Sequence, residues 1–289
     1  MISMKNNILG IICTFLFAII VCGAVSATTT TNFSSDGKVI NITHSYVPST
    51  LKTSITTTTK TGTYGNGKYT TVILSGKDNK GRNTNDTTLI YNGVVKSTTI
   101  KISSSDGFSL NEKASFGTNS IVIILSGKLN STVTFSGNET GPITYLNGQP
   151  ILKTGVGIIK YYVGGKIYAT SKITEVCTYK NFNGNYLMVN DTDTTNTLYA
   201  NGNTRKSKMT TINSINSSGT QIGMKISGTS SGTEKINNKI VTYTGKISIG
   251  TKYDPKDLNK YNMGDYKEIL TSSSSTLLKI VPFESIDNS

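Results

Sequence analysis

Residues 158–170 read IIKYYVGGKIYAT, two short runs of apolar and aromatic residues separated by two glycines. A Gly-Gly linker can adopt the positive φ angles of a tight hairpin turn, so this stretch predicts two antiparallel strands with Tyr161 opposite Tyr168. Asn-Gly pairs separate further runs of the same kind, at Asn92-Gly93, Asn147-Gly148, Asn183-Gly184 and Asn201-Gly202. Turns at this spacing indicate sequential antiparallel pairing, because parallel strands need longer crossover connections.

The chain is therefore predicted to be all-β, with antiparallel meander sheets that form a sandwich or a strongly curved half-barrel. We expect a single domain over residues 28–289, since no linker divides it. One short helix is predicted near the C-terminus, because Asp254 is placed as an N-cap, Pro255 at the first helical position and Gly264 as a stop. Its body would run from about Pro255 to Asn262.

The segment Ile-Leu-Ser-Gly-Lys occurs twice, beginning at Ile73 and at Ile124. Each copy follows an aromatic-glycine pair and precedes an Asn-Gly pair, so we predict repeated β modules at about 62–110 and 114–165. Ile73 and Ile124 should then lie on matching faces. Neither copy is a phosphate loop, because the second glycine and the four-residue spacer are missing. The glycine is expected to let a strand bend, and the lysine to face water.

Residues 1–27 have the layout of a secretory signal, in which the apolar run from Ile8 to Val21 is followed by small residues up to Ala27. The apolar run is shorter than the roughly 20 residues that a membrane helix needs. We predict cleavage that leaves Thr28 as the first residue, with residues 28–37 flexible. No transmembrane segment is expected in the mature chain, and a secreted or extracellular, envelope-associated location follows.

Of the three cysteines, Cys13 and Cys22 lie within the predicted signal. Lipidation of Cys22 is an alternative to simple cleavage, but Val21 is larger than the residue usually found before a lipidated cysteine. Cys177 then has no partner within the chain, which excludes a disulfide framework. It is predicted to be a half-buried strand residue, since nothing near it in the sequence would lower its pKa.

The formal net charge of the chain is +13, and lysine carries most of it. The lysines are spread singly and do not alternate with aromatic residues, which argues against nucleic-acid binding. Such dispersed charge favours loose association with an anionic envelope and protects sheet edges. Seven sequons are candidates for N-glycosylation and are expected in surface loops, beginning at Asn32, Asn41, Asn85, Asn130, Asn138, Asn190 and Asn216.

No group of residues predicts a catalytic, cofactor or metal site. The one histidine, His44, has no further His or Cys residues near it in the sequence that could complete a metal site. A Ser-x-x-Lys motif begins at Ser49, but strand-like threonines follow it, whereas in serine acyltransferases this motif begins a helix. Asp191 and Asp193 lack the glycine and closing glutamate of a calcium loop, so a solvated turn is predicted. We expect no turnover to depend on any of these residues or on Cys177.

The function predicted first is that of a non-catalytic secreted or cell-surface β-protein, acting by binding or as an envelope component. Its partner would be an envelope polymer, a surface protein or an apolar ligand. As an alternative, residues 160–168, 179–188 and 196–199 resemble the meander of lipoprotein-carrier-like half-barrels, which implies a curved sheet that holds an apolar ligand. A secreted hydrolase is the third possibility. A concave face lined by apolar side chains would favour the carrier, and a filled core would favour the surface protein.

Overall fold

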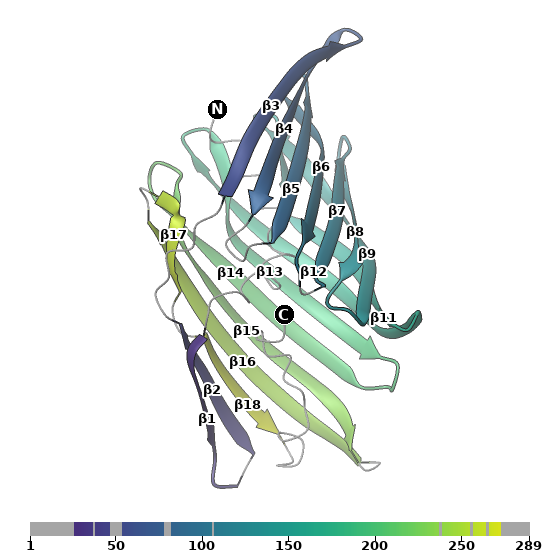
Figure 1. Ribbon diagram of the computed structural model, residues 1–289, viewed down its shortest axis with the longest axis vertical. Coiled ribbons are helices and arrows are strands. Elements are labelled where there is room, and N and C mark those ends of the chain that lie inside the picture. Colours follow the sequence, from purple (N-terminus) through teal and green to yellow (C-terminus); the bar gives the residue numbers. More distant parts are fainter. Residues whose placement is uncertain are drawn as a thin grey trace.

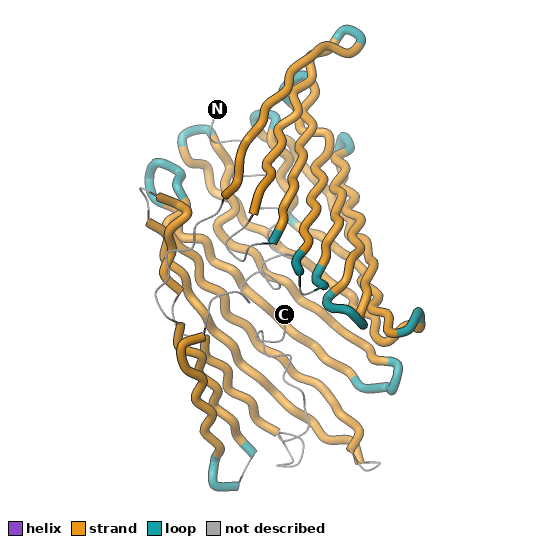
Figure 2. The backbone as a smooth tube through the Cα atoms, viewed as in Figure 1, coloured by secondary structure: helices purple, strands orange, loops and turns teal. Residues whose placement is uncertain are grey.

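The computed structural model of the chain is a strongly curved sheet, and Figure 2 shows strands throughout its described part. The residues that it describes are 26–36, 38–46, 54–77, 82–105, 107–236, 239–254, 257–263 and 266–272. Ser49 and all but the last two residues of the predicted signal lie outside these ranges. The prediction of cleavage before Thr28 therefore stays a prediction.

In the described part of the chain, eighteen strands make up one sheet. In the first half of the chain they are β1 (Ser26–Phe33), β2 (Val39–Tyr46), β3 (Ser54–Tyr64), β4 (Gly67–Lys77), β5 (Asn83–Tyr91), β6 (Val94–Ser103), β7 (Ser109–Phe116), β8 (Ser120–Lys128) and β9 (Val133–Leu146). In the second half they are β10 (Gln149–Leu152), β11 (Thr154–Val163), β12 (Lys166–Phe182), β13 (Asn185–Tyr199), β14 (Thr204–Ile215), β15 (Gln221–Ile236), β16 (Lys239–Asp254), β17 (Asp257–Met263) and β18 (Tyr266–Ser272).

All pairings between these strands are antiparallel, which confirms the predicted all-β meander. The order runs from β3 to β9, passes from β9 to β11, continues to β16, and ends with β18, β2 and β1. Among the described residues no pairing joins β1 to β3, so the sheet is not closed. Figure 1 shows the sheet curving so that β3–β9 stand in front of β11–β16. A single continuous sheet favours the strongly curved arrangement over two separate sheets.

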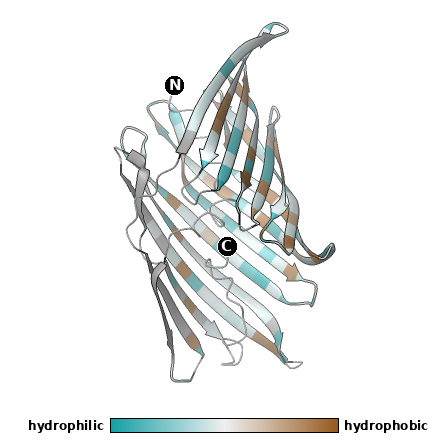
Figure 3. Ribbon diagram, in the orientation of Figure 1, coloured by the Kyte–Doolittle hydropathy of each residue, from teal (hydrophilic) through white to brown (hydrophobic). Residues whose placement is uncertain are grey.

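The hydrophobic core lies where the sheet bends, between β5–β9 on one side and β10–β12 on the other. Strand side chains alternate between two faces, and the inward positions of β8 are accordingly Ile121, Ile123 and Leu125, all at most 4% exposed. The four residues of β10 are all buried. Figure 3 shows apolar positions interspersed with polar ones along the strands. The core is filled by side chains over this part of the sheet.

The two Ser-Gly-Lys segments occupy matching places in β4 and β8. Ile73 pairs with Thr87 on the outer face, and Ile124 is 58% exposed on the same face, so the two isoleucines face as predicted. The two glycines are needed for different reasons. Gly76 has a positive φ of 149°, whereas at Gly127 a Cβ would collide with the backbone of β7. The modules also differ after the Asn-Gly turn, where β10 is short and β11 replaces it beside β9.

The Gly-Gly hairpin joins β11 to β12 as predicted, with φ angles of 57° at Gly164 and 76° at Gly165. The predicted pairing of Tyr161 with Tyr168 is wrong, because a register shift places Tyr161 opposite Ala169. Tyr168 instead packs edge-to-face against Tyr199, with ring centroids 5.6 Å apart. A β-bulge therefore moves one tyrosine off the expected cross-strand pair.

Near the ends of the chain, one segment expected to be helical and one expected to be flexible both form strands, which contradicts the helix and leaves the flexibility a prediction. The predicted helix is wrong from Asp257 onward, where the chain forms β17 and pairs with β16. Pairing with a long neighbouring strand outweighs a local helix signal only two turns long. Residues 28–33, expected to be flexible, lie in β1 beside β2.

Candidate functional site: a buried carboxyl and thiol cluster

The inner face of the sheet gathers carboxyl groups and a thiol at the middle of β12 and β13. Glu175 and Cys177 are two residues apart on β12, so their side chains point to the same face. In the register of β13, Asp193 lies opposite Glu175 and Asp191 opposite Cys177. Four side chains are thereby brought together by two strands.

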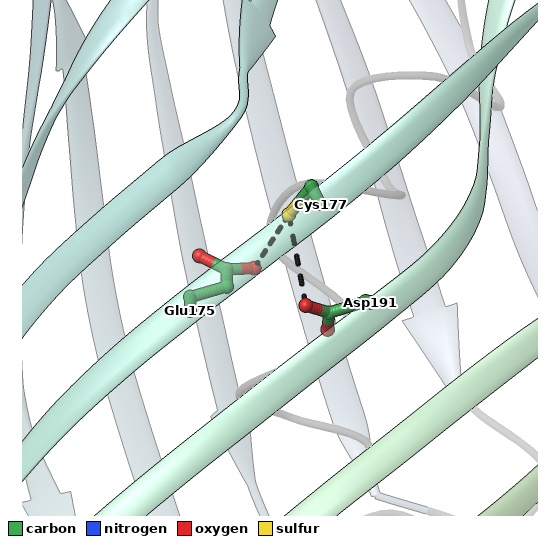
Figure 4. Close-up of side chains that lie close together, drawn as sticks. All are labelled: Glu175, Cys177 and Asp191. Carbon is green, nitrogen blue, oxygen red and sulfur yellow. Dashed lines mark hydrogen bonds between the residues drawn. The ribbon is translucent and has the colours of Figure 1, made fainter.

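Glu175, Cys177 and Asp191 form the tightest part of this group (Figure 4). The Cys177 Sγ lies 3.2 Å from Oε1 of Glu175 and 3.6 Å from Oδ1 of Asp191. One donor atom from each residue lies within 4.8 Å of the other two. Glu175 and Asp191 are each 1% exposed and Cys177 is 5% exposed, so water has little access to the group.

A third strand, β9, adds Glu139, which is 1% exposed. Gly155 of β11 lies opposite Glu175, and a Cβ there would overlap the Glu139 carboxylate. Because Gly155 has no side chain, the carboxyl groups of Glu139 and Glu175 can approach each other beside it. Glu139 and the protonated Glu175 carboxyl form a hydrogen bond, and no other described group donates to Glu139. Oδ2 of Asp191 has no hydrogen-bond partner among the described residues.

Burial dominates the electrostatics of this cluster, because it disfavours the charged form of an acid. It raises the pKa of Asp191 to about 7 and that of Asp193 to about 8. Burial and the neighbouring carboxyl groups raise the pKa of Glu175 well above its usual value, and the pKa of the Cys177 thiol is raised by the same causes. Without a cation the groups therefore retain protons near neutral pH.

Two more buried acids continue the inner face toward β5. Burial raises the pKa of Glu112 on β7 to about 8, with smaller contributions from Glu139 and Asp86. Burial likewise raises the pKa of Asp86 to about 6. In contrast, every lysine whose side-chain burial the structure describes is exposed. Acids inside and lysines outside give the sheet two faces of different charge.

The prediction that Asp191 and Asp193 lie in a solvated turn is wrong, since both belong to β13 and Asp191 is buried. The sequence carried a usable signal, because each pair of the cluster is spaced by two residues within a stretch long enough for a strand. Cys177 does lie in a strand, as predicted, but it is fully buried. Glu139 and Glu175 were not recognised from the sequence as members of a site.

The remaining candidates do not join this cluster. His44 lies on β2, opposite Thr29 of β1 and Tyr266 of β18. The expectation that the sequons lie in surface loops is wrong for most of them. Only two are in turns, Asn130 and Asn216, and the others are in strands, namely Asn32, Asn41, Asn85, Asn138 and Asn190. Whether any of them carries a glycan stays a prediction.

No protein-family model matches the chain, and no curated protein matches it. Among solved structures, the chain is similar to Pseudomonas aeruginosa OccK8 (OprE), with 7% identity, a TM-score of 0.35, and coverage of 81% of this chain and 86% of that one. It is similar to Pseudomonas aeruginosa OccK2 (OpdF) in complex with glucuronate, with 9% identity, a TM-score of 0.32, and coverage of 87% and 100%. It is also similar to a mutant of the Rh. blastica porin, with 9% identity, a TM-score of 0.29, and coverage of 81% and 89%. Likenesses this slight carry no inference about function.

No helix in the described part of the chain is long and apolar enough to cross a membrane.

Proposed function

We propose that this protein is a secreted or cell-surface β-protein that acts without catalysis, by binding an anionic polymer of the cell envelope through the outer face of its sheet. The observation that carries the proposal is the separation of charge across the sheet. Exposed lysines lie along the outer face, whereas five described acids are buried, namely Asp86, Glu112, Glu139, Glu175 and Asp191. Asp36, which pairs with Lys38, is exposed. Burial raises the pKa of Glu112 and Asp193 to about 8, so these groups carry little negative charge near neutral pH and compensate little of the outer positive charge.

The lysines of three strands share one cross-strand row. Stepping from each residue to the one directly opposite it on the next strand leads from Lys113 of β7 across β8, β9 and β11 to Lys172 of β12. The same steps lead from Lys172 across β13 to Lys206 of β14. All three side chains are exposed. Neighbouring strands are about 4.8 Å apart, so the row runs roughly 19 Å along the curved sheet from Lys113 to Lys172, and roughly 10 Å further to Lys206. An extended polyanion can lie across the strands along this outer lysine row.

Exposed lysines separated by these distances attract a flexible polyanion at long range and bind it weakly at each point. Such attraction is screened over about 8 to 10 Å at physiological salt. Binding should therefore depend steeply on ionic strength and on the number of lysines engaged, as expected for a component that associates loosely with an envelope.

The non-catalytic part of the proposal rests on the state of the reactive groups. A catalytic acid, base or nucleophile must reach its substrate and must change protonation near the working pH. The Cys177 thiol is buried, and its raised pKa keeps it from forming the reactive thiolate. Asp191 is equally inaccessible, at 1% exposure.

The apolar-ligand carrier has less support. The bend of the sheet is filled by its own side chains. A surface hollow of about 690 Å³ lies near the ends of β4–β7, but Ile102 and Leu110 are its only hydrophobic lining residues in the described part of the chain, and two lysines, Lys77 and Lys101, border it. Apolar ligands are held in cavities lined mainly by hydrophobic side chains.

The test is binding to polyglutamate, with neutral dextran as the uncharged comparison. A triple variant of the outer lysine row, Lys113→Gln, Lys172→Gln and Lys206→Gln, should lose binding by about tenfold or more, since each surface charge contributes up to about 1 kcal/mol. A matched triple variant removes the same charge elsewhere, at Lys68, Lys166 and Lys239, which lie at strand ends.

The matched variant should lose distinctly less affinity than the row variant. Equal losses of affinity in the two variants would mean that net charge, and not the outer lysine row, determines binding. Binding to dextran as tight as to polyglutamate would overturn the proposal.

A further inference from the structure

We propose that Glu175, Cys177 and Asp191 bind one divalent cation of the borderline class that accepts both sulfur and oxygen ligands, such as Zn²⁺. Glu139 supplies the fourth ligand from β9, which β11 separates from β12. This inference goes beyond the proposed function and does not depend on polymer binding at the outer face.

The first support is geometric. In a tetrahedral zinc site with Zn–S near 2.3 Å and Zn–O near 2.1 Å, sulfur and oxygen ligands are about 3.6 Å apart. The Cys177 Sγ lies 3.2 Å from the Glu175 oxygen and 3.6 Å from the Asp191 oxygen. The three donor atoms therefore need only small shifts to surround one ion, as their convergence in Figure 4 suggests.

The second support is a hydrogen-bond count. The Cys177 thiol donates one proton but lies within hydrogen-bonding distance of two carboxyl groups, so it satisfies only one of them and the other must stay protonated in a buried site. Asp191 Oδ2 finds no other donor among the described residues. A buried polar atom left without a partner destabilises the fold, and a bound cation would remove that penalty.

The third support is independent of the three ligands and comes from Glu139. Its carboxylate lies on β9, is 1% exposed and hydrogen bonds to the protonated Glu175 carboxyl. No backbone amide or other side chain of the described residues donates to its two oxygens. Gly155 makes this approach possible, because any larger residue would place a Cβ where the carboxylate lies. Glu139 and Glu175 are thus two buried carboxyl groups held together by a proton, beside Cys177 and Asp191, and displacement of that proton by a bound cation would make both of them ligands.

The donor set also indicates which cation binds. Calcium and magnesium take six or more oxygens and keep water, and a thiolate suits neither ion. A thiolate with carboxylates suits zinc and, as a probe of the same chemistry, cadmium. Binding requires the thiol proton and the protons retained by the carboxyl groups to leave, so uptake of the ion should release protons to solution.

The experiment titrates the chelator-treated mature chain with Zn²⁺ alone and, separately, with Cd²⁺ alone. We expect one ion per chain, measurable proton release, and with Cd²⁺ the ultraviolet charge-transfer band of a metal thiolate. Cys177→Ser should abolish the band, and both Cys177→Ser and Asp191→Asn should weaken Zn²⁺ binding by about 100-fold, since even supporting residues around metal ligands cost about 10- to 100-fold.

Asp86→Asn is the matched control, because Asp86 is also a buried acid of the inner face but lies outside the cluster. It should bind Zn²⁺ as the parent does. Circular dichroism checks that each variant keeps its strands, and the cadmium band in the folded parent needs no variant at all. The inference is overturned if that band is absent, if Cys177→Ser binds Zn²⁺ as tightly as the parent, or if Ca²⁺ competes on equal terms.

Discussion

Replacing Glu112 by glutamine should change how the stability of the protein depends on pH. Glu112 is 3% exposed on β7, and burial raises its pKa from 4.5 to about 8. The folded protein therefore binds this proton more tightly than the unfolded chain does. Stability is retained below the unfolded pKa and is lost as the pH rises toward the folded pKa.

The expected size follows from the two pKa values. Between pH 5 and pH 7 the free energy of unfolding of the parent should fall by about 2 to 3 kcal/mol through this group alone, at 1.36 kcal/mol per unit. Glutamine has nearly the same shape and carries no charge at either pH. Glu112→Gln should thus leave stability nearly unchanged at pH 5 and raise it relative to the parent by about that amount at pH 7.

Urea unfolding at pH 5, 6, 7 and 8, with a chelator present so that no cation neutralises the inner acids, measures the difference. Asp36→Asn is the control, because Asp36 is exposed and hydrogen bonds from Ser34 and Lys38 hold its pKa below the usual value. That variant should follow the parent between pH 5 and pH 8. A difference between Glu112→Gln and parent that stays constant with pH, or that shrinks as the pH rises, would refute the reasoning.

Three further outcomes can be measured directly. Gly155→Ala should destabilise the fold by about 1 to 3 kcal/mol through overpacking. Gly250→Ala, whose added Cβ would lie 3.8 Å from the Met224 carbonyl oxygen, should be close to neutral in the same urea assay. Ile121→Ala, at 0% exposure, should lower the free energy of unfolding by about 2 to 5 kcal/mol. Ile124→Ala, on the outer face, should lower it by about 0.5 kcal/mol or less, and equal losses would contradict the placement of the core. Sequencing the N-terminus of the secreted protein should find Thr28, and recovery of the uncleaved chain would contradict a cleaved signal.

Local features of this fold were predictable because they depend on a few adjacent residues. The Gly-Gly and Asn-Gly turns were found correctly, since few residues other than glycine and asparagine adopt the positive φ angles that those turns need. The offset between Tyr161 and Tyr168 was not predictable, because a bulge depends on the whole length of two paired strands. The helix expected after Asp254 failed for a similar reason, since β16 offers pairing to the segment.

The buried carboxyl and thiol cluster of β12 and β13 could be predicted from the sequence only in part. The spacing of two residues within each pair was visible, but the face that becomes buried depends on which strands lie across the bend. Polar residues such as Asp193 and Thr192 suggest a solvated turn when they are considered alone. Only the register with β12 and the approach of Glu139 from β9 bring the acids together.

Co-sedimentation of the purified mature protein with the isolated envelope of its own host tests the central claim most directly. The account predicts that the protein sediments with the envelope at low salt, is released as the ionic strength rises, and is released at lower salt when Lys113, Lys172 and Lys206 are replaced by glutamine. Retention that is insensitive to salt and unchanged in that variant, or no retention at low salt, would contradict it.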